Sequence, residues 1–306
     1  MWHYKPSEKP NNIIVFCFLF TLHGAALFGL IFFRSYWHLL PLTFTYIFLI
    51  QNLGITFGYH RCLAHRSFEF RYKWMERLFV TFGCCGFQMG PIWWCSIHRM
   101  HHKYSDTSQD PHDRTKGFWY SHIIWLIHLD PHYTLPPKSE FYFDNVKDIY
   151  ADPYYRWLDK YFFVPWICSL AAFYSIGAWP WVFWGGIIPF LYHHHATWLV
   201  NSVTHRLGYR SFETKPLTDR STNNWLIGLL AIGEGWHNNH HAFPSSAKHG
   251  FFRWWELDLT YIVIVLFRNL GLVNSLKIPQ QVTNALGQSS TYASRQSVKI
   301  IVRRAK

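Results

Sequence analysis

The feature that most limits the fold of this chain is a set of long runs that contain no charged side chain. These runs cover residues 13–33, 35–60 and 161–205. A helix of about 20 residues, rising about 1.5 Å per residue, crosses the roughly 30 Å hydrocarbon core of a bilayer. The third run is long enough to cross it twice. We therefore predict four transmembrane helices, at about 13–33, 37–58, 161–178 and 181–200.

The four predicted helices are joined in pairs by tight turns. Residues 34–37 connect the first two, and residues 179–181 connect the last two, next to the helix breakers Gly177 and Pro180. Only 15% of the residues are charged, against roughly 25% in a typical soluble domain. The alternative, that the runs are buried helices of a soluble protein, fits this composition poorly. The predicted fold class is an all-α integral membrane protein with two helical hairpins.

The 29 lysine and arginine residues are divided very unevenly between the two sides of the predicted helices. Only Arg34 lies in a turn on the far side. Because positively charged loops tend to stay in the cytoplasm, this distribution places both termini and the segments 59–160 and 201–306 there. The formal charge of +12 then reflects orientation and anionic lipid headgroups, and nucleic acid is not an expected partner.

We expect the two large cytoplasmic segments to fold together as a helical cap. The cap would comprise residues 59–160 and 201–275, so that residues 1–275 form a single domain and the polar, basic residues 276–306 form a tail. Residues 78–98 are uncharged but contain several glycines, and we interpret them as a helix of the cap or interface rather than as a fifth span. Residues 251–267 have the pattern of an amphipathic helix at the membrane surface.

Histidine is the most unusual component of the sequence, with 20 residues. Four short motifs hold nine of them: HRCLAH, HRMHH, NSVTH and HNNHH. In HxxHH on a helix, positions i, i+3 and i+4 lie on one face, so that they can present two or three imidazoles to one metal site. The nine residues are His60, His65, His98, His101, His102, His205, His237, His240 and His241.

The predicted membrane topology brings these four motifs together. HRCLAH follows the second predicted helix, HRMHH precedes the third, and NSVTH and HNNHH follow the fourth. All four therefore lie at one membrane surface, where nine imidazoles exceed the ligands of one ion and favour two ions. Imidazole suits zinc, copper, iron and nickel. We expect two nearby carboxylates, Glu234 and Asp106, to orient imidazole N–H groups rather than to bind metal.

The remaining histidines are weaker candidates for metal binding. We interpret His23, within the first predicted helix, as a polar packing contact. His193, His194 and His195 are consecutive, so on a helix they point in three directions. The isolated histidines are expected at the surface or as capping residues: His3, His38, His112, His122, His128, His132 and His249.

The histidine motifs and their flanking residues resemble those of membrane fatty acid desaturases of the stearoyl-CoA (delta-9) type, especially the bacterial and cyanobacterial branch. The resemblance covers roughly residues 40–275 and includes GYHRCLAHRSFE, HRMHHKYSDTSQDPHDRTKGFWYSH, NSVTHRLGYRSFET and NNWLIGLLAIGEGWHNNHHAFPSSAKHG. It implies that the nine histidines ligate two iron ions, and that Asn201 acts through a water molecule. It also implies O2-dependent formation of a cis double bond, at the delta-9 position, in a C16 or C18 acyl chain.

The resemblance further implies a bent, apolar tunnel for the acyl chain between the predicted spans and the cap. Gln88 and Trp94 match the family's residues at the bend, and Thr197 and Trp198 match its opposite wall. Simple packing would account for the two tryptophans almost equally well. A bend in such a tunnel would determine both the position and the cis geometry of the double bond.

The sequence departs from the acyl-CoA enzymes of animals at one place. Those enzymes carry a charged pair directly before the second histidine motif, whereas this chain has Ser96 and Ile97. The acyl carrier therefore stays open between CoA and a membrane lipid.

The chain contains no HPGG haem segment, and the resemblance implies a separate electron donor, ferredoxin-like or cytochrome b5-like with its reductase. The expected location is the inner membrane of a bacterium. Four nearby cations could contact phosphates or form a solvated basic face: Arg99, Lys103, Arg114 and Lys116.

Other classes of function remain open at the level of the sequence. A lipid or alkane hydroxylase with the same motifs would insert oxygen instead of removing a second hydrogen. A membrane metal transporter would place its ligands inside the spans near the bilayer midplane, where only His23 and His193–His195 lie. A metal-dependent lipid hydrolase would act without oxygen.

Overall fold

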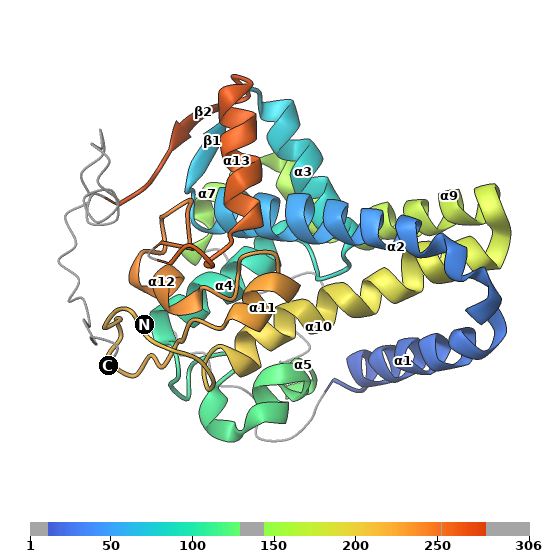
Figure 1. Ribbon diagram of the computed structural model, residues 1–306, viewed down its shortest axis with the longest axis horizontal. Helices are drawn as coiled ribbons and strands as arrows, with labels where there is room; N and C mark the ends of the chain where they lie inside the picture. Colours follow the sequence, from blue (N-terminus) through green and yellow to red (C-terminus); the bar gives the residue numbers. More distant parts are fainter. Residues whose placement is uncertain (1–11, 129–143, 252, 280–306) are drawn as a thin grey trace.

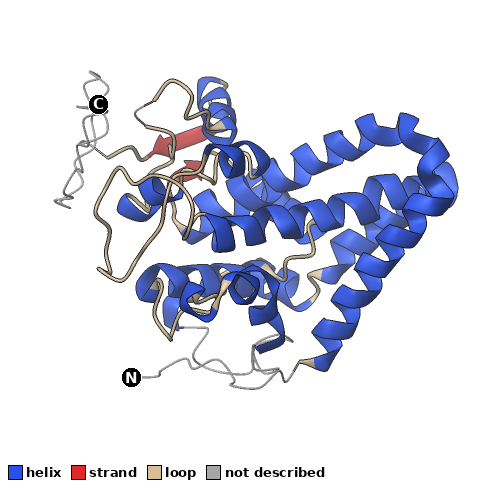
Figure 2. Ribbon diagram, turned by 60° about the horizontal axis from the view of Figure 1, so that its bottom comes forward, coloured by secondary structure: helices blue, strands red, loops and turns tan. Residues whose placement is uncertain are grey.

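The computed structural model of the protein describes residues 12–128, 144–251 and 253–279. Within these ranges the chain is mostly helical, and Figure 1 shows long helical segments that project to one side of a group of shorter helices. Figure 2 shows the same division from another direction, with one small sheet among the shorter helices. The predicted all-helical class is therefore correct apart from this two-stranded sheet.

The first long helical segment runs from Ile13 to Ala64, over 52 residues. Asn12 caps its start, because the Asn12 side chain accepts a hydrogen bond from the N–H of Val15 at 3.2 Å. The segment bends at Tyr36, whose φ of −92° and ψ of 24° depart from helical values, and this bend lies inside the predicted turn at 34–37. Its parts are α1 (Ile13–Phe33), η1 (Arg34–Leu39), α2 (Leu40–Ile47) and η2 (Phe48–Ala64).

The second long segment runs from Phe163 to Val203, over 41 residues. It loses helical geometry at Gly177 and Ala178, just before the predicted turn at 179–181. Pro180 favours a break here, because in a regular helix its ring would clash with the carbonyl group of Ile176 and it lacks an N–H to donate. Both long segments are apolar and long enough to cross a bilayer, but their arrangement as four spans stays a prediction. The parts are α9 (Phe163–Val182), η6 (Phe183–Ile187) and α10 (Ile188–Val203).

The end of the first long segment, η2, is a wide π-helix that lies directly on α3 (Lys73–Cys85). A Cβ atom on Gly54 would lie 2.6 Å from the backbone nitrogen of Gly83, and one on Gly58 would lie 2.9 Å from the carbonyl oxygen of Phe79. Both positions therefore require glycine. π-Helical turns occur frequently at functional sites, and this one carries the first histidine motif.

The shorter elements make up the part of the chain predicted as a cap. Strands β1 (Phe68–Phe70) and β2 (Val273–Leu276) pair antiparallel and join the two cap segments. The predicted domain boundary at 275 falls inside β2, and the tail beyond residue 279 lies outside the described residues. The helices are α4 (Pro91–Tyr104), η3 (Arg114–Lys116), η4 (Tyr120–Ile124), α5 (Trp125–His128), α7 (Lys147–Tyr150), α8 (Pro153–Lys160), α11 (Trp225–Leu230), α12 (His237–Ala242) and α13 (Leu259–Asn269).

Two sequence predictions about the cap need correction. Residues 78–98 do not form one helix, because α3 ends at Cys85 and α4 begins at Pro91, with glycines in between. The amphipathic helix predicted at 251–267 begins only at Leu259 and ends at Asn269. Asp258 sets that start, since its side chain accepts a hydrogen bond from the N–H of Tyr261 at 2.9 Å.

Candidate metal centre

The nine histidines of the four motifs lie together at the junction between the long helices and the cap. His60 comes from η2, and His65 follows its end directly. The second motif lies on α4, His205 follows the end of α10, and the last motif forms most of α12. Four chain segments that are far apart in the sequence therefore contribute imidazoles to one region, as the order of the motifs and the predicted helices leads us to expect.

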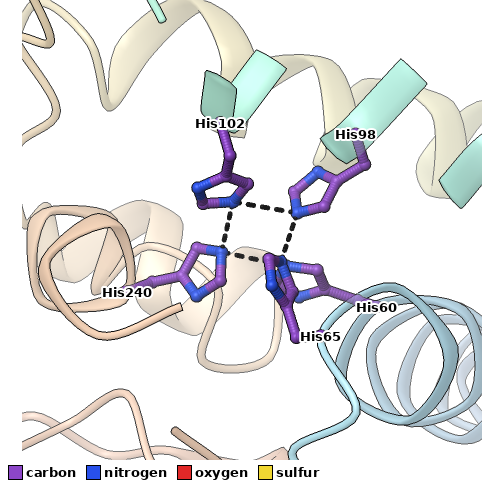
Figure 3. Close-up of side chains that lie close together, drawn as sticks. All are labelled: His60, His65, His98, His102 and His240. Carbon is purple, nitrogen blue, oxygen red and sulfur yellow. Dashed lines mark hydrogen bonds between the residues drawn. The ribbon is translucent and has the colours of Figure 1, made fainter. Parts of the chain in front are cut away.

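Five of these imidazoles form one group, whose ligand nitrogens all lie within 4.8 Å of one another. The Nε2 atoms of His65 and His98 are 2.7 Å apart, and those of His102 and His240 are 2.8 Å apart. Figure 3 shows the rings pointing toward a common centre. The group consists of His60, His65, His98, His102 and His240.

Burial lowers the pKa of His65, His98 and His240 well below the ordinary histidine value, and their neighbours lower these pKa values further. The rings are therefore neutral at physiological pH, which is the form that binds metal. Neutral imidazoles whose Nε2 lone pairs converge repel one another unless a cation lies between them. The five-histidine group therefore fits a metal ion.

The other four histidines form a second group of converging ligand nitrogens. The ligand nitrogens of His101, His205, His237 and His241 lie within 4.8 Å of one another and all four residues are buried. Nε2 of His237 lies 3.0 Å from Nε2 of His205, and Nε2 of His101 lies 3.2 Å from Nε2 of His241. The nine predicted residues thus divide into five and four, which supports two metal positions.

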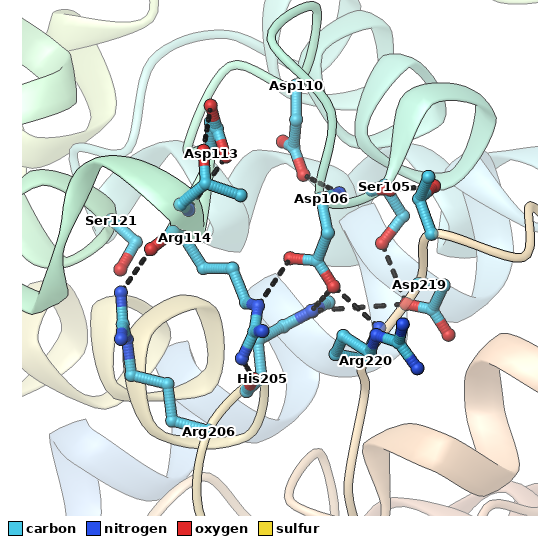
Figure 4. A network of polar contacts seen from close by, with 12 residues as sticks. Ser105, Asp106, Asp110, Asp113, Arg114, Ser121, His205, Arg206, Asp219 and Arg220 are labelled. Carbon is cyan, nitrogen blue, oxygen red and sulfur yellow. Dashed lines mark hydrogen bonds and ion pairs between the residues drawn. The ribbon is translucent and has the colours of Figure 1, made fainter.

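Carboxylates contact both groups of histidines at Nδ1, on the side of each ring opposite the converging Nε2 atoms. Oε2 of Glu234 lies 2.7 Å from Nδ1 of His60, and Oδ2 of Asp106 lies 3.1 Å from Nδ1 of His205 (Figure 4). These are the two carboxylates that the sequence analysis assigned to orienting imidazoles. Such a contact fixes the proton on Nδ1 and leaves Nε2 free for metal.

Sequence reasoning missed two further carboxylates of the same kind. Oδ2 of Asp110 lies 2.9 Å from Nδ1 of His101, and Oδ1 of Asp219 lies 3.1 Å from Nδ1 of His241. Burial alone would raise the pKa of Asp110 and Asp219, but the adjacent histidines lower both pKa values below the ordinary range. Asp110 follows His101 by nine residues and Asp219 lies in a distant loop, so no helical spacing identifies either one.

The start of α4 is fixed by a carboxylate from another helix. Oδ1 of Asp159, on α8, accepts hydrogen bonds from the N–H groups of Ile92 and Trp93 at 2.9 and 3.0 Å. Burial raises the pKa of Asp159 to about 6, although the two backbone hydrogen bonds lower it. The three histidines on α4 therefore depend on a cap supplied by α8.

We expect Asp159→Ala to destabilise the protein by about 1–2 kcal/mol, because two buried N–H groups lose their acceptor. The effect is measured as a fall of a few degrees in the thermal unfolding temperature of the detergent-solubilised protein. Asp144→Ala is the matched control, since the Asp144 side chain is 66% exposed. Equal unfolding temperatures for the two variants would contradict the capping role.

The four residues predicted for the acyl tunnel line one cavity of about 300 Å³ next to the histidines. Nε2 of Gln88 donates to Oγ1 of Thr197 at 2.9 Å, and Nε1 of Trp94 donates to Oε1 of Gln88 at 3.2 Å. Trp198 and Asn201 line the same cavity, together with His60, His98, His101 and His237. Its walls are mostly apolar and extend from α1 to both histidine groups.

Several expectations for the isolated histidines are wrong. His112, His122 and His249 are buried instead of lying at the surface. The ring of His112 lies 4.2 Å from that of His101, and the ring of His249 lies 4.4 Å from that of His240. Tertiary packing of distant segments places these rings, so no local spacing predicts them.

The other histidines fall outside the two groups. His193–His195 belong to neither group, and His23 makes the expected polar contact, with its Nε2 3.1 Å from Nε2 of His195. His38 is exposed and His128 half-buried. His3 and His132 lie outside the described residues.

Two of the four cations considered as phosphate contacts donate hydrogen bonds to backbone carbonyl groups. Arg99 donates to the carbonyl oxygens of Leu63 and Ala64 and to the carboxylate of Asp148. Arg114 donates to the carbonyl oxygen of His205 at 2.6 Å. Lys103 and Lys116 are exposed.

Comparison with known proteins agrees with the resemblance found in the histidine motifs. Residues 35–264 match the model of a family described as fatty acid desaturase. The chain is 43% identical over 274 residues to the sn-1 stearoyl-lipid 9-desaturase of Anabaena variabilis, covering 89% of this chain and 96% of that protein. It is 39% identical to the sn-1 stearoyl-lipid 9-desaturase of Synechocystis sp., over 92% and 85% of the two chains. It is 42% identical to an acyl-CoA 5-desaturase of Anemone leveillei, over 80% and 74%.

Proposed function

This chain belongs to the fatty acid desaturase family, and we propose that it introduces a cis double bond at the delta-9 position of a saturated C16 or C18 acyl chain. It is an oxidoreductase that acts on acyl chains, as its relatives are. The observation that carries the proposal is that nine imidazoles converge in two groups, and that both groups contribute histidines to the wall of one apolar cavity. The acyl chain is carried on CoA or on a membrane lipid.

Two iron ions are the proposed cofactors. One would be held by His60, His65, His98, His102 and His240, and the other by His101, His205, His237 and His241, with Asn201 completing the smaller set through a water molecule. Nitrogen ligands of this kind suit iron. When bound, the irons would supply one-electron redox chemistry and activation of O2.

The overall reaction requires an electron donor. Removing one hydrogen from each of two adjacent CH2 groups, while O2 is reduced to two water molecules, consumes two further electrons and two protons. We propose that a separate one-electron carrier, ferredoxin-like or cytochrome b5-like with its reductase, supplies these electrons.

The protein itself contributes positioning and exclusion of water. The apolar walls of the cavity hold the acyl chain beside the imidazoles, and the hydrogen-bonded set of Gln88, Thr197 and Trp94 fixes the shape of the wall. Holding two chosen carbons at the metal centre, and all others away from it, is worth several orders of magnitude in rate.

The variant Gln88→Leu tests this role of the cavity wall. We expect monoenes at neighbouring positions to accompany the main product, and the rate to fall about tenfold, because Trp94 and Thr197 lose their partner. Mass spectrometry of derivatised fatty acids gives the double-bond positions. Gln51→Leu is the matched control, since Gln51 lines the same cavity without contacting that pair. A single unchanged double-bond position in Gln88→Leu would contradict the assignment.

We further propose that the chain is a multi-pass protein of a bacterial inner membrane, with spans at about 13–33, 37–58, 161–178 and 181–200. Large apolar side chains on α1 support this proposal, since Phe20 is 73% and Leu27 69% exposed. Contiguous apolar surface of this kind is unfavourable in water. The distribution of lysine and arginine favours cytoplasmic termini and a cytoplasmic metal centre.

The function is tested by fatty acid analysis of host cells that lack an aerobic desaturase of their own. Cells that express the protein with a compatible donor should contain new cis-monoenes at one position, dependent on oxygen and absent from His240→Ala. Hydroxylated acyl chains would instead assign the protein to the hydroxylases. No new product, with iron and a donor shown to be present, would reopen the transporter hypothesis.

A further inference from the structure

His249 is a fully buried histidine that belongs to neither group of converging imidazoles. It lies seven residues beyond the end of α12. Its ring centre is 4.4 Å from that of His240 and 5.6 Å from that of His60, both of which belong to the five-histidine group. A tenth imidazole therefore lies against this group without joining it.

The backbone of His249 is held on both sides. Its N–H donates to Oδ2 of Asp258 at 2.7 Å, and its carbonyl oxygen accepts a hydrogen bond from Nδ2 of Asn239 at 2.9 Å. Asn239 lies on α12 between the ligand histidines, and Asp258 caps α13. The position of the His249 ring is thus coupled directly to the helix that carries His240.

The side chain of His249 faces the carboxylate that orients His60. Oε2 of Glu234 lies 2.7 Å from Nδ1 of His60 and 3.4 Å from Nδ1 of His249. A nitrogen lone pair directed at a carboxylate oxygen is repelled by it, so this geometry favours a proton on Nδ1 of each ring. Two imidazoles therefore face one oxygen of Glu234 through Nδ1, His60 at close range and His249 at a longer distance.

The other oxygen of Glu234 is already engaged. Oε1 accepts hydrogen bonds from Nε and Nη2 of Arg61 at 3.2 and 3.0 Å. Arg61 therefore fixes one side of the carboxylate, and the two histidines meet the other. Without His249, Oε2 would keep only one of the two imidazoles that now face it.

We propose that His249 is a positioning residue of the five-histidine metal site, acting through Glu234 on His60 and through its ring on His240. The proposal rests on the proposed function only in requiring that this site binds metal. Partners behind a metal ligand set the orientation and basicity of its ring, and losing one lowers metal affinity about 10- to 100-fold.

Three substitutions separate the possible roles of His249. Asparagine places an N–H donor near the position of Nδ1, glutamine places its amide farther out, near Nε2, and phenylalanine keeps only the ring. Binding of Fe²⁺ and Co²⁺ to the metal-free, detergent-solubilised protein is measured by equilibrium dialysis, and the cobalt absorption spectrum reports ligand geometry. The control is His38→Phe, because His38 is exposed and far along the chain from the metal centre.

We expect the unaltered protein and His38→Phe to bind two ions. His249→Phe and His249→Gln should bind one of them about 10- to 100-fold more weakly, with an altered cobalt spectrum, while His249→Asn stays within a few-fold. Wild-type affinity and spectrum in His249→Phe, or equal losses in His249→Asn and His249→Phe, would overturn the role of His249. Failure of the unaltered protein to bind two ions would overturn the proposed metal centre instead.

Discussion

Replacing His101 by alanine is expected to abolish desaturation and to remove one of two bound metal ions. His101 belongs to the smaller group, which has only four imidazoles, and no other histidine of that group can take its place. The loss should exceed the roughly 10- to 100-fold cost of removing an outer partner of a ligand. The measurement is the content of cis-monoenes in host cells, together with the iron content of the purified variant.

The matched control for this prediction is His128→Ala, which removes a half-buried histidine outside both groups. It should leave the product and the iron content unchanged. His101→Ala should still insert into the membrane, because the long helices do not depend on its ring. Full desaturation by His101→Ala would show that the four-histidine group is not part of the active site.

The second large effect is expected from Arg61→Met, which should destabilise the protein by about 3–5 kcal/mol. The Arg61 guanidinium is fully buried and lies 3.0 Å from Oε1 of Glu234 and 2.9 Å from Oδ1 of Asp258. Its removal leaves two buried carboxylates without their main partner. Part of this cost is offset, because the variant no longer has to bury the charge of an arginine. Thermal unfolding in detergent measures the effect.

A second substitution checks this explanation. Arg61→Met combined with Asp258→Asn removes one of the unpaired charges and should recover part of the lost stability. Arg210→Met is the control, because Arg210 donates to a carbonyl oxygen and to Thr214 rather than to a carboxylate. An unfolding temperature of Arg61→Met equal to that of Arg210→Met would contradict the account.

The set of nine converging histidines was predictable from sequence motifs and their order along the chain. The i, i+3, i+4 pattern puts the histidines of one motif on one helix face, and the order of motifs and apolar runs puts all motifs at one membrane surface. All nine of these histidines lie in the two groups. Their division into five and four depends on how α4 and α12 cross, which spacing does not determine.

The outer partners of the imidazoles were only partly predictable. Glu234 lies three residues before His237, and Asp106 lies four residues after His102, so proximity in sequence indicated them. Asp219 and His249 reach the centre from loops whose path depends on long-range packing. Asp219 is placed by contacts such as the hydrogen bond from Oγ of Ser105 to its Oδ1 at 2.7 Å.

The positions of the long helices were predicted better than their local geometry. Both bends fall at or next to the predicted turns. Glycine and proline mark the second bend, whereas the first, at Tyr36, contains neither residue. The π-helical form of η2 and the close contact of its Gly54 and Gly58 with α3 were not predicted. The antiparallel pair of β1 and β2 was missed because each strand is only three or four residues long.

The central claim is tested most directly with the purified protein loaded with iron, supplied with a reductant and with stearoyl lipid in detergent or vesicles. O2 uptake and acyl products are measured in the same sample. We predict one cis-monoene for each O2 consumed beyond background, no product without oxygen, and a double bond at the delta-9 position. Hydroxylated acyl chains as the main product, or monoene formed in the absence of oxygen, would contradict the account.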